Sequence, residues 1–389
     1  LRHYTFMLEG LVETAGTLAK RGIPLVCRRG EPPQVALALA RQAALLVCDV
    51  GCCRHQKSWR TLVARQAPCP VVQVESDVVV PVAAASPKAE YAARTLRPKL
   101  QRLLPDYLVP APRLTPEQSG LGLDLEGLAI QDGAAALLKG LKIDRTVGAV
   151  SRFFPGGAAA AKKRFQRFLD ERLCRYARNS NQPQTDDVSG MSPFLHFGQI
   201  SPLYLALTLK NHAAECSADR DAYLEELIVR RELAANFVHY TPDYDRFGCL
   251  PGWARKTLGE HAADPRPHLY PRAALAAAET HDPYWNAAMR EMTTTGFMHN
   301  YMRRYWGKKV LEWSPTPAAA FETLLGLNNR YFLDGRDPNS FAGVAWIFGM
   351  HDRAWPERKV FGKVRSMTAA GLERKCDIRA YVAKVSRLP

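Results

Sequence analysis

Segments with the residue pattern of β-strands are confined to the first hundred residues of this chain. Short aliphatic runs lie at 23–28, 43–50 and 69–76. Stretches with helical periodicity separate these runs, at 32–42 and 55–66. Strands that alternate with helices form parallel sheets covered by helices. The pattern therefore predicts an α/β domain, a doubly wound parallel sheet, at the start of the chain.

Beyond residue 155 the strand pattern disappears, and helical patterns continue to the end of the chain. A length of 389 residues also favours more than one hydrophobic core. We predict an α/β domain over 1–105, an interdomain linker over the Pro- and Gly-rich residues 106–154, and an all-α domain over 155–389. No uncharged apolar stretch is long enough to span a bilayer, so no membrane segment is predicted.

The first residue and the cysteines bear on the origin of the chain. It begins with Leu1 and shows no basic-then-apolar leader, so we expect that its true N-terminus, with the first strand of the sheet, is missing. Nine cysteines without C-x-x-C spacing are typical of reduced thiols in an intracellular protein and predict no metal site. We expect a cytoplasmic protein, close to the nucleoid in a bacterium or archaeon and nuclear in a eukaryote.

The charge of the chain indicates its class of partner. The formal net charge is +15 and the isoelectric point is about 9.5. The basic residues are spread along the chain rather than gathered in a tail. Such a surface favours a polyanionic partner, nucleic acid first. General solubility of a basic protein is the alternative explanation.

Three of the seven tryptophans lie between residues 282 and 313: Trp285, Trp306 and Trp313. Trp306 and Trp313 are two helical turns apart and share a helix face, about 10 Å apart along the axis. Aromatic residues at helical spacing usually pack in a core. The alternative is a relay of oxidisable indoles that leads from a buried cofactor to the surface.

The segment 185–202, TDDVSGMSPFLHFGQISP, places small and hydroxyl residues before an apolar helical run. Ser192 followed by Pro193 predicts a helix start with serine as the cap. Free backbone N–H groups at such an end suit a phosphate, although capped helices are common.

The segment 222–237 places Glu226 and Arg230 four residues apart on one predicted helix. They could form an exposed ion pair of a few tenths of a kcal/mol. Alternatively, Glu226 points into a pocket and binds a polar ligand while the arginine contacts phosphates.

The segment 327–355 is dense in polar and turn-forming residues and continues into an aromatic run with Trp346 and Trp355. Such a combination suits a flat heteroaromatic ligand with hydrogen-bonding edges. An ordinary connection between helices is the alternative.

Together these segments resemble the photolyase/cryptochrome family, and more narrowly the class II cyclobutane pyrimidine dimer photolyases. The resemblance runs along the whole chain. It is densest in MSPFLHFGQIS (191–201), ELIVRREL (226–233), the stretch 284–313 and the stretch 328–367 that begins NNRYFLDGRDPNS.

The resemblance implies an N-terminal α/β domain, able to hold an antenna chromophore, and a helical domain that binds FAD. The residues that match the cofactor-binding positions are Tyr176, Ser189, Gly190, Met191, Ser192, Arg303, Asn328, Asp334, Gly335, Arg336 and Asn339. Arg303 would lie beside flavin N5, with Asp334 as its carboxylate partner at the ring edge. Asn328 would lie near N5, with Asn329 and Asn339 as competitors. A cation and an amide there would stabilise a buried anionic flavin.

The resemblance also gives the tryptophans a role, in a chain that photoreduces FAD. By position, Trp306 would lie nearest the flavin, Trp285 in the middle and Trp313 at the surface.

The implied substrate is DNA that contains a cyclobutane pyrimidine dimer, flipped out of the helix. Glu226 would hydrogen-bond the dimer, and Trp346 would fill or flank the gap it leaves. The residues that match DNA-contacting positions are Arg230, Trp346, Arg353, Trp355, Arg358, Lys359 and Arg365. We expect a monomer that uses light to repair this lesion by electron transfer.

Two departures from the family pattern stand out. Ser180 occupies a position where an arginine is expected, which puts one local ion pair or DNA contact in doubt. The absent first strand leaves the antenna open: an 8-hydroxydeazaflavin, a folate and none are all compatible with the sequence.

Two other functions compete with repair. A cryptochrome-like blue-light photoreceptor would need FAD and the tryptophans but neither Glu226 nor the basic residues. A DNA-damage-binding protein without flavin would not need Arg303 and Asp334.

Overall fold

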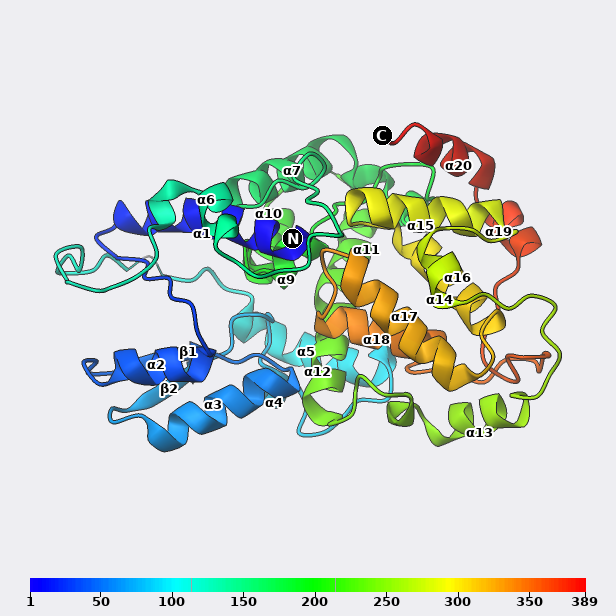
Figure 1. Ribbon diagram of the computed structural model, residues 1–389, viewed down its shortest axis with the longest axis horizontal. Helices are drawn as coiled ribbons and strands as arrows, with labels where there is room; N and C mark the ends of the chain where they lie inside the picture. The colour runs from blue at the N-terminus through cyan, green and yellow to red at the C-terminus, as the bar shows by residue number, and fades with distance from the viewer. Residues whose placement is uncertain (113, 214) are drawn as a thin grey trace.

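A two-stranded parallel sheet forms the α/β part of the molecule. The computed structural model describes residues 1–112, 114–213 and 215–389. Strands β1 (Leu46–Asp49) and β2 (Val71–Val74) pair in parallel, with Leu46 opposite Val71. Helix α3 (Arg54–Gln66) connects them, and α2 (Pro32–Ala40) packs on α3 (Figure 1). The predicted alternation of strands and helices is confirmed in this unit.

The predicted strand at 23–28 is wrong. Its backbone runs beside residues 120–128 instead of beside β1: the Gly120 N–H donates to the Gly22 carbonyl at 2.8 Å, and the Leu128 N–H to the Cys27 carbonyl at 2.7 Å. Pro24 has no N–H to give to a ladder. The aliphatic run is therefore covered by the connecting segment rather than by a sheet neighbour.

Helix α1 (Arg2–Ala19) lies against helices outside the sheet unit. It packs on η1 (Ile130–Asp132), α6 (Ala134–Lys139) and α7 (Ala158–Glu171), as Figure 1 shows. The buried Arg2 guanidinium donates to the carbonyls of Met292, at 3.1 Å, and Tyr331, at 2.6 Å. The start of the described chain is thus bonded to the helical region, while the domain bounds themselves stay a prediction.

The rest of the molecule is helical. Short elements connect its longer helices: α4 (Val82–Ala85), η2 (Leu173–Arg175), α8 (Tyr176–Asn179), α9 (Ser192–His196), η4 (Phe247–Cys249) and α14 (Arg272–Ala276). The longer ones are α5 (Ala93–Tyr107), α10 (Pro202–Lys210), α11 (Ser217–Leu224), α12 (Arg231–Tyr240), α13 (Gly252–Glu260), α15 (Pro283–Thr295), α16 (Asn300–Glu312), α17 (Pro317–Tyr331), α18 (Pro338–Ile347), α19 (Ala369–Lys375) and α20 (Ile378–Ser386). A π-helical turn, η3 (Glu225–Arg230), joins α11 to α12. The predicted helical domain is confirmed as a fold class.

The largest core lies in the C-terminal half, where α15, α16, α17 and α18 pack together (Figure 1). The tryptophans of α15 and α16 lie inside it, with Met289, Met292 and Phe321. A second core joins Phe6 of α1 to α5, α7 and α11. In the described residues no helix is long and apolar enough to cross a membrane.

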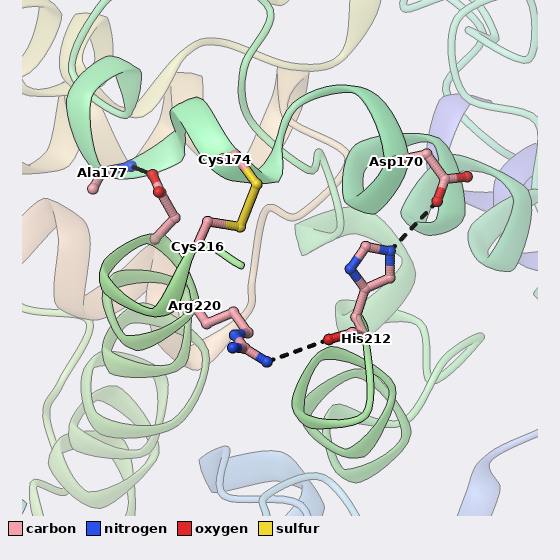
Figure 2. The surroundings of a disulfide bond; sticks show 7 residues. Asp170, Cys174, Ala177, His212, Cys216 and Arg220 are labelled. Carbon is pink, nitrogen blue, oxygen red and sulfur yellow. Dashed lines mark hydrogen bonds and ion pairs between the residues drawn. A yellow bond between two sulfur atoms is a disulfide. The ribbon is translucent and has the colours of Figure 1, made fainter. Parts of the chain in front are cut away.

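The expectation that all nine cysteines are reduced is wrong. Cys174 and Cys216 form a disulfide, and the other seven cysteines are free. The bond joins η2 to the residue that precedes α11 (Figure 2). The sequence separation of 42 hides this contact, because packing of α11 on η2 and α8 brings the thiols together.

Candidate functional site

The three tryptophans form a continuous contact chain with Trp285 in the middle. The Trp285 and Trp306 rings are stacked with centroids 6.5 Å apart, and the Trp285 indole N–H donates to the Trp306 carbonyl at 3.0 Å. Trp313 meets Trp285 edge-on at 5.7 Å. The predicted surface position of Trp313 is wrong, because its side chain is only 2% exposed. The rings of Tyr270 and His281 lie against it.

Trp306 and Arg303 lie one turn apart on α16 and have different partners. The Trp306 indole Nε1 is buried and has no hydrogen-bond partner among the described residues. The Arg303 Nη2 donates to both carboxylate oxygens of Asp334, at 2.9 and 3.0 Å. The same guanidinium lies over the Phe332 ring, 3.8 Å from its centroid. The predicted pairing of Arg303 with Asp334 is present in the structure.

A close backbone approach brings Asp334 next to the end of α17. At Gly335 a Cβ atom would come within 2.9 Å of the Asn328 carbonyl oxygen, so the tight contact needs glycine. Asn328 is buried, and its amide group exchanges hydrogen bonds with Ser340 at 2.8 and 3.1 Å. The backbone after Asp334 thus lies against Asn328, whose amide group is held by Ser340.

The other predicted residues of this turn are more exposed. Asn339 is exposed and donates to Asp337 at 3.0 Å. Arg336 is exposed with a positive φ of 69°, and its backbone N–H donates to Asn329. The charge of Arg336 acts on His3 and Tyr4 of α1. None of these contacts of Asn339 and Arg336 involves Arg303.

The segment 189–192 packs on an aromatic cluster. The Tyr223 hydroxyl donates to the Ser189 Oγ at 3.0 Å, and the Tyr223 ring meets Tyr176 edge-on at 5.3 Å. Burial raises the pKa of Tyr176 and Tyr223, so both stay protonated. Gly190 has a φ of +64°, which favours glycine. Tyr223 thus contacts both Ser189 and Tyr176, two of the predicted cofactor-binding residues.

The predicted cap at Ser192 is wrong. Helix α9 begins at Ser192, its N-cap is the buried Met191, and no side chain caps it. Ser192 is exposed. Because Pro193 is the second helical residue, the serine already has helical backbone geometry and its hydroxyl does not reach the free N–H groups.

Glu226 lies on the π-helical turn η3, a rare geometry that is frequent at functional sites. Of the two alternatives for Glu226, the ion pair with Arg230 is not formed among the described residues: the Arg230 Nε donates to Glu225 at 3.1 Å, and Arg97 binds the same carboxylate. The π turn shifts the side chains, so four-residue spacing no longer aligns them. Glu226 is exposed, and its charge acts on Arg304 and Tyr176.

Trp346 and Trp355, which the family resemblance matches to DNA-contacting positions, share a cluster of cations. The Arg365 guanidinium lies 5.6 Å from the Trp346 centroid and 4.0 Å from that of Trp355. Arg304 is 5.5 Å from the Trp346 ring. Asp352 accepts from Arg365 at 3.1 Å. Such contacts order the arginines before any ligand arrives.

Three further predicted DNA-contacting residues are exposed: Arg353, Arg358 and Lys359. Arg353 lies 4.9 Å from the Trp355 centroid and so extends the cluster. Arg358 and Lys359 occupy the turn closed by the backbone pair of Arg358 and Gly362. Among the described residues, neither the Arg358 nor the Lys359 side chain lies over the ring of Trp346 or Trp355.

Sequence reasoning missed three residues at the site. Tyr223 binds Ser189, Arg304 joins Trp346, and Lys308 donates to the Ile347 carbonyl beside the Trp346 ring. A signal existed for Arg304, which follows Arg303 directly. Tyr223 and Lys308 carried none, because an aromatic and a lysine on helices are usually core and surface residues.

The residues fit the FAD that the family resemblance implies. Besides the Trp306 Nε1, the His299 Nε2 is buried without a partner among the described residues. His299 caps α16 by accepting the Tyr301 N–H on Nδ1, and burial lowers its pKa to about 3. Its neutral ring therefore carries the proton on Nε2. Two orphaned donors beside an arginine–aspartate pair are what a polar cofactor would satisfy.

A cleft of about 520 Å³ separates the sheet unit from α9 and α10. Its lining includes Trp59 and Arg60 of α3, Asp49 of β1, and His196 of α9. His196 lies within 3.1 Å of Asp337 Oδ2 in the C-terminal half. The cleft thus adjoins the helical region through that contact.

Sequence comparison finds a close match to known enzymes. The sequence model of the DNA photolyase family matches residues 2–117. Over the whole chain the protein is 49% identical to the deoxyribodipyrimidine photo-lyase of Methanothermobacter thermautotrophicus, of which it covers 84%. It is 39% identical, over 99% of the chain, to the enzyme of the same name from Potorous tridactylus, of which it covers 73%.

Two solved structures share the fold at low identity. The cryptochrome of Synechocystis superposes with a TM-score of 0.72 at 17% identity, over the whole chain and 79% of that protein. A class III photolyase from Agrobacterium tumefaciens gives 0.70 at 17% identity, over 98% of the chain and 77% of that protein. The fold and the full-length sequence similarity agree, and the chain belongs to the photolyase/cryptochrome family.

Proposed function

We propose that the protein binds FAD and uses light to split cyclobutane pyrimidine dimers in DNA, as a class II enzyme of its family. When bound, FAD supplies light absorption and a one-electron donor to the dimer. The names of the full-length relatives support repair of DNA. What we propose beyond this is the substrate, a cyclobutane pyrimidine dimer, and the mechanism, electron transfer from FAD.

One observation carries it: neighbouring residues of α16 serve three different tasks. Arg303 binds Asp334, Arg304 lies against Trp346, and Trp306 stacks on Trp285. The first contact orders a cation beside the orphaned donors, and the second belongs to the arginine–tryptophan cluster. One helix therefore joins the cofactor residues, the DNA-contacting residues and the tryptophan chain.

Each group then has a definite task. Arg303, fixed by Asp334 and Phe332, offers a preorganised positive charge to an anionic cofactor. Glu226 accepts hydrogen bonds from the flipped dimer, close to the charge of Arg304. Trp346, Trp355, Arg353 and Arg365 hold the DNA strand through stacking and phosphate contacts. A photoreceptor would have no use for this basic aromatic surface, and this favours repair.

The tryptophan chain serves photoreduction rather than repair. We expect Trp306→Phe to slow photoreduction of bound FAD, because it interrupts the chain at its first contact. After chemical reduction the same variant should still repair the lesion. Loss of repair in the chemically reduced variant would contradict this division of tasks.

The decisive experiment uses protein that has been chemically reduced without oxygen and mixed with an oligonucleotide carrying one thymine dimer. We expect thymine absorbance near ~260 nm to return under blue light and not in the dark. Glu226→Ala should lower the rate about tenfold or more, and Glu226→Gln less. High salt should weaken binding. Absence of repair by flavin-loaded protein would favour a photoreceptor instead.

We further propose that the cleft beside β1 holds any antenna that the protein uses. The cleft combines the Trp59 ring with the charges of Arg60 and Asp49, which suits a flat polar chromophore. The absorbance spectrum of the purified protein tests this, since a second chromophore adds a band to that of the flavin. Trp59→Ala should remove that band and leave the flavin in place.

A further inference from the structure

The turn 357–363 presents two cations to solvent from a fixed base. The side chains of Arg358 and Lys359 are exposed. Neither forms an ion pair among the described residues, and the carboxylate of the turn has other partners. The next two residues, Val360 and Phe361, are buried in the largest core. The turn therefore anchors its apolar residues and leaves both positive charges available to a polyanion.

His261, the C-cap of α13, holds this turn through both nitrogens of its ring. Its Nδ1 lies 2.6 Å from Asp264 Oδ2, and its Nε2 lies 2.9 Å from Glu357 Oε1. An ionised carboxylate only accepts hydrogen bonds, so the two contacts together require a proton on each nitrogen. The carbonyl end of α13 also favours a cation. This clasp of His261, Asp264 and Glu357 is therefore complete only when the imidazole is charged.

Asp264 extends the clasp to the middle of the turn. The Asp264 Oδ2 that faces His261 also accepts the Val360 backbone N–H at 2.7 Å. Val360 has a φ of +69°, an unfavourable conformation for a β-branched residue that only surrounding contacts can hold. Nearby, the Lys363 backbone N–H donates to the Thr257 Oγ1 of α13 at 3.0 Å. The clasp thus helps to fix the backbone that carries the two exposed cations.

The charges around His261 favour its protonated form. The hydrogen bond to Asp264, and then that to Glu357, raise the pKa of His261 against the effect of burial. Two further cations face these carboxylates: the charge of Arg266 acts on Asp264, and the Lys363 Nζ lies 4.0 Å from Glu357. As the pH rises through the raised pKa of His261, one proton leaves. One ring nitrogen then faces a carboxylate without a hydrogen, and the clasp is lost.

We propose that His261 is a positioning residue for DNA: in its protonated form it holds the turn 357–363 so that Arg358 and Lys359 contact phosphates. This inference rests on the proposed function, which assigns these two cations to DNA. Loss of the proton acts in two ways with the same sign. The turn is released, and the Glu357 carboxylate keeps a negative charge that no imidazolium offsets and that repels phosphate.

The test measures the affinity of flavin-loaded protein for an oligonucleotide with one thymine dimer, in the dark, by fluorescence anisotropy between pH 6 and pH 9. We expect the dissociation constant of the unmodified protein to rise about tenfold over this range. His261→Gln cannot be charged, so it should bind about tenfold more weakly at pH 6 and lose most of the pH dependence. His261→Arg keeps a charge and several donors, and should bind at pH 9 about as tightly as at pH 6.

His268→Gln is the matched control, because His268 is exposed and its ring contacts are with aromatic rings rather than carboxylates. It should bind DNA like the unmodified protein at each pH. Replacement of both Arg358 and Lys359 by Gln should weaken binding. In that protein a further His261→Gln substitution should have no effect, since the clasp acts only through the two cations.

Nuclear magnetic resonance of the His261 ring gives a readout that requires no substitution. Because coupled binding is reciprocal, addition of the oligonucleotide should raise the pKa of His261. An unchanged titration of His261 with DNA, or equal affinities of His261→Gln and the unmodified protein at pH 6, would overturn the inference while light-driven repair persists. If the unmodified protein does not bind the lesion-bearing oligonucleotide, the proposed function fails and the inference fails with it.

Discussion

The sheet unit and the helical region differ in how far their apolar side chains are exposed to solvent. Val47, Val72 and Val74 of β1 and β2 are 56%, 46% and 48% exposed. In the helical region, by contrast, Trp285 is fully buried and Trp306 is only 3% exposed. Burial of apolar area is the main stabilising contribution to a fold. The comparison therefore locates most of the stabilisation in the helical region.

Charged side chains also differ in burial between the two regions. Lys308 is fully buried in the main core, and its ammonium group donates to the Ile347 carbonyl. Arg54 of the sheet unit is half-exposed and pairs with Asp245. A buried charge must be compensated by its surroundings, whereas an exposed pair contributes little. The helical region therefore depends on specific contacts that the sheet unit does not need.

The largest effect should come from Trp285, which contacts both other tryptophans. Trp285→Ala removes a large buried ring and leaves a cavity, so we expect a loss of about 3–5 kcal/mol in the free energy of unfolding. Chemical denaturation followed by circular dichroism measures this. Trp59→Ala in the half-buried helix α3 is the comparison and should cost much less. Equal losses in the two variants would contradict the contrast between the regions.

The disulfide should have the next largest effect. It closes a loop of 42 residues that contains Tyr176 and the segment 189–192. Restriction of the unfolded chain by such a loop corresponds to roughly 3–4 kcal/mol, so reduction by a thiol should lower the stability of the helical region by about that amount. Cys174→Ser should show the same loss without reductant. Titration of thiols in unfolded protein checks the bond: nine reactive groups without reductant would show that it does not form.

Lys308 gives a smaller effect that depends on pH. Burial lowers its pKa to about 7, whereas the unfolded chain keeps the ordinary value of 10.5. Below pH 7 the Lys308 ammonium is charged in the folded and in the unfolded protein. Folding then carries the full free-energy cost of burying this charge. Between pH 7 and 10.5 the unfolded chain binds the proton that the folded protein has released, so stability rises with pH.

Lys308→Met removes this dependence. We expect the variant to gain about 2 kcal/mol relative to the unmodified protein between pH 9 and pH 6, measured by denaturation at each pH. Lys256→Met, at an exposed lysine, is the control and should show no such trend. A constant difference between the Lys308 variant and the unmodified protein at all pH values would contradict the depressed pKa.

Local patterns in the sequence were enough to predict that an α/β unit precedes a helical region along the chain. The strand pattern located β1 and β2, and helical periodicity located α2 and α3 and indicated the helical region beyond residue 155, because these signals depend on neighbouring residues. The run at 23–28 has the same composition as a strand but bonds to residues 120–128. Its partner is distant in sequence, so composition alone could not distinguish the two outcomes.

At the site, too, local motifs were predictable from the sequence, whereas contacts between distant segments were not. Family motifs identified Arg303 and Asp334, which the structure pairs. The partner of Arg230 is Glu225 rather than Glu226 because a π-helical turn replaces the regular helix. The cover of Trp313 comes from Tyr270 and His281, which precede the helix of Trp285. Contacts made by packing of separate segments carry no local signal.

The smallest effect is expected on the exposed face of the sheet, where Val47 and Val72 are register partners. Val72→Thr keeps the branched shape that strands favour and removes one methyl group from solvent. We therefore expect the free energy of unfolding to change by less than about 0.5 kcal/mol. Denaturation under the conditions used for Trp285→Ala gives the value. A loss above about 2 kcal/mol would mean that this face is covered in solution, since only a buried methyl group has such an effect. The sheet face would then be exposed only in the isolated described chain. In solution a further segment or a second copy of the chain would have to cover it.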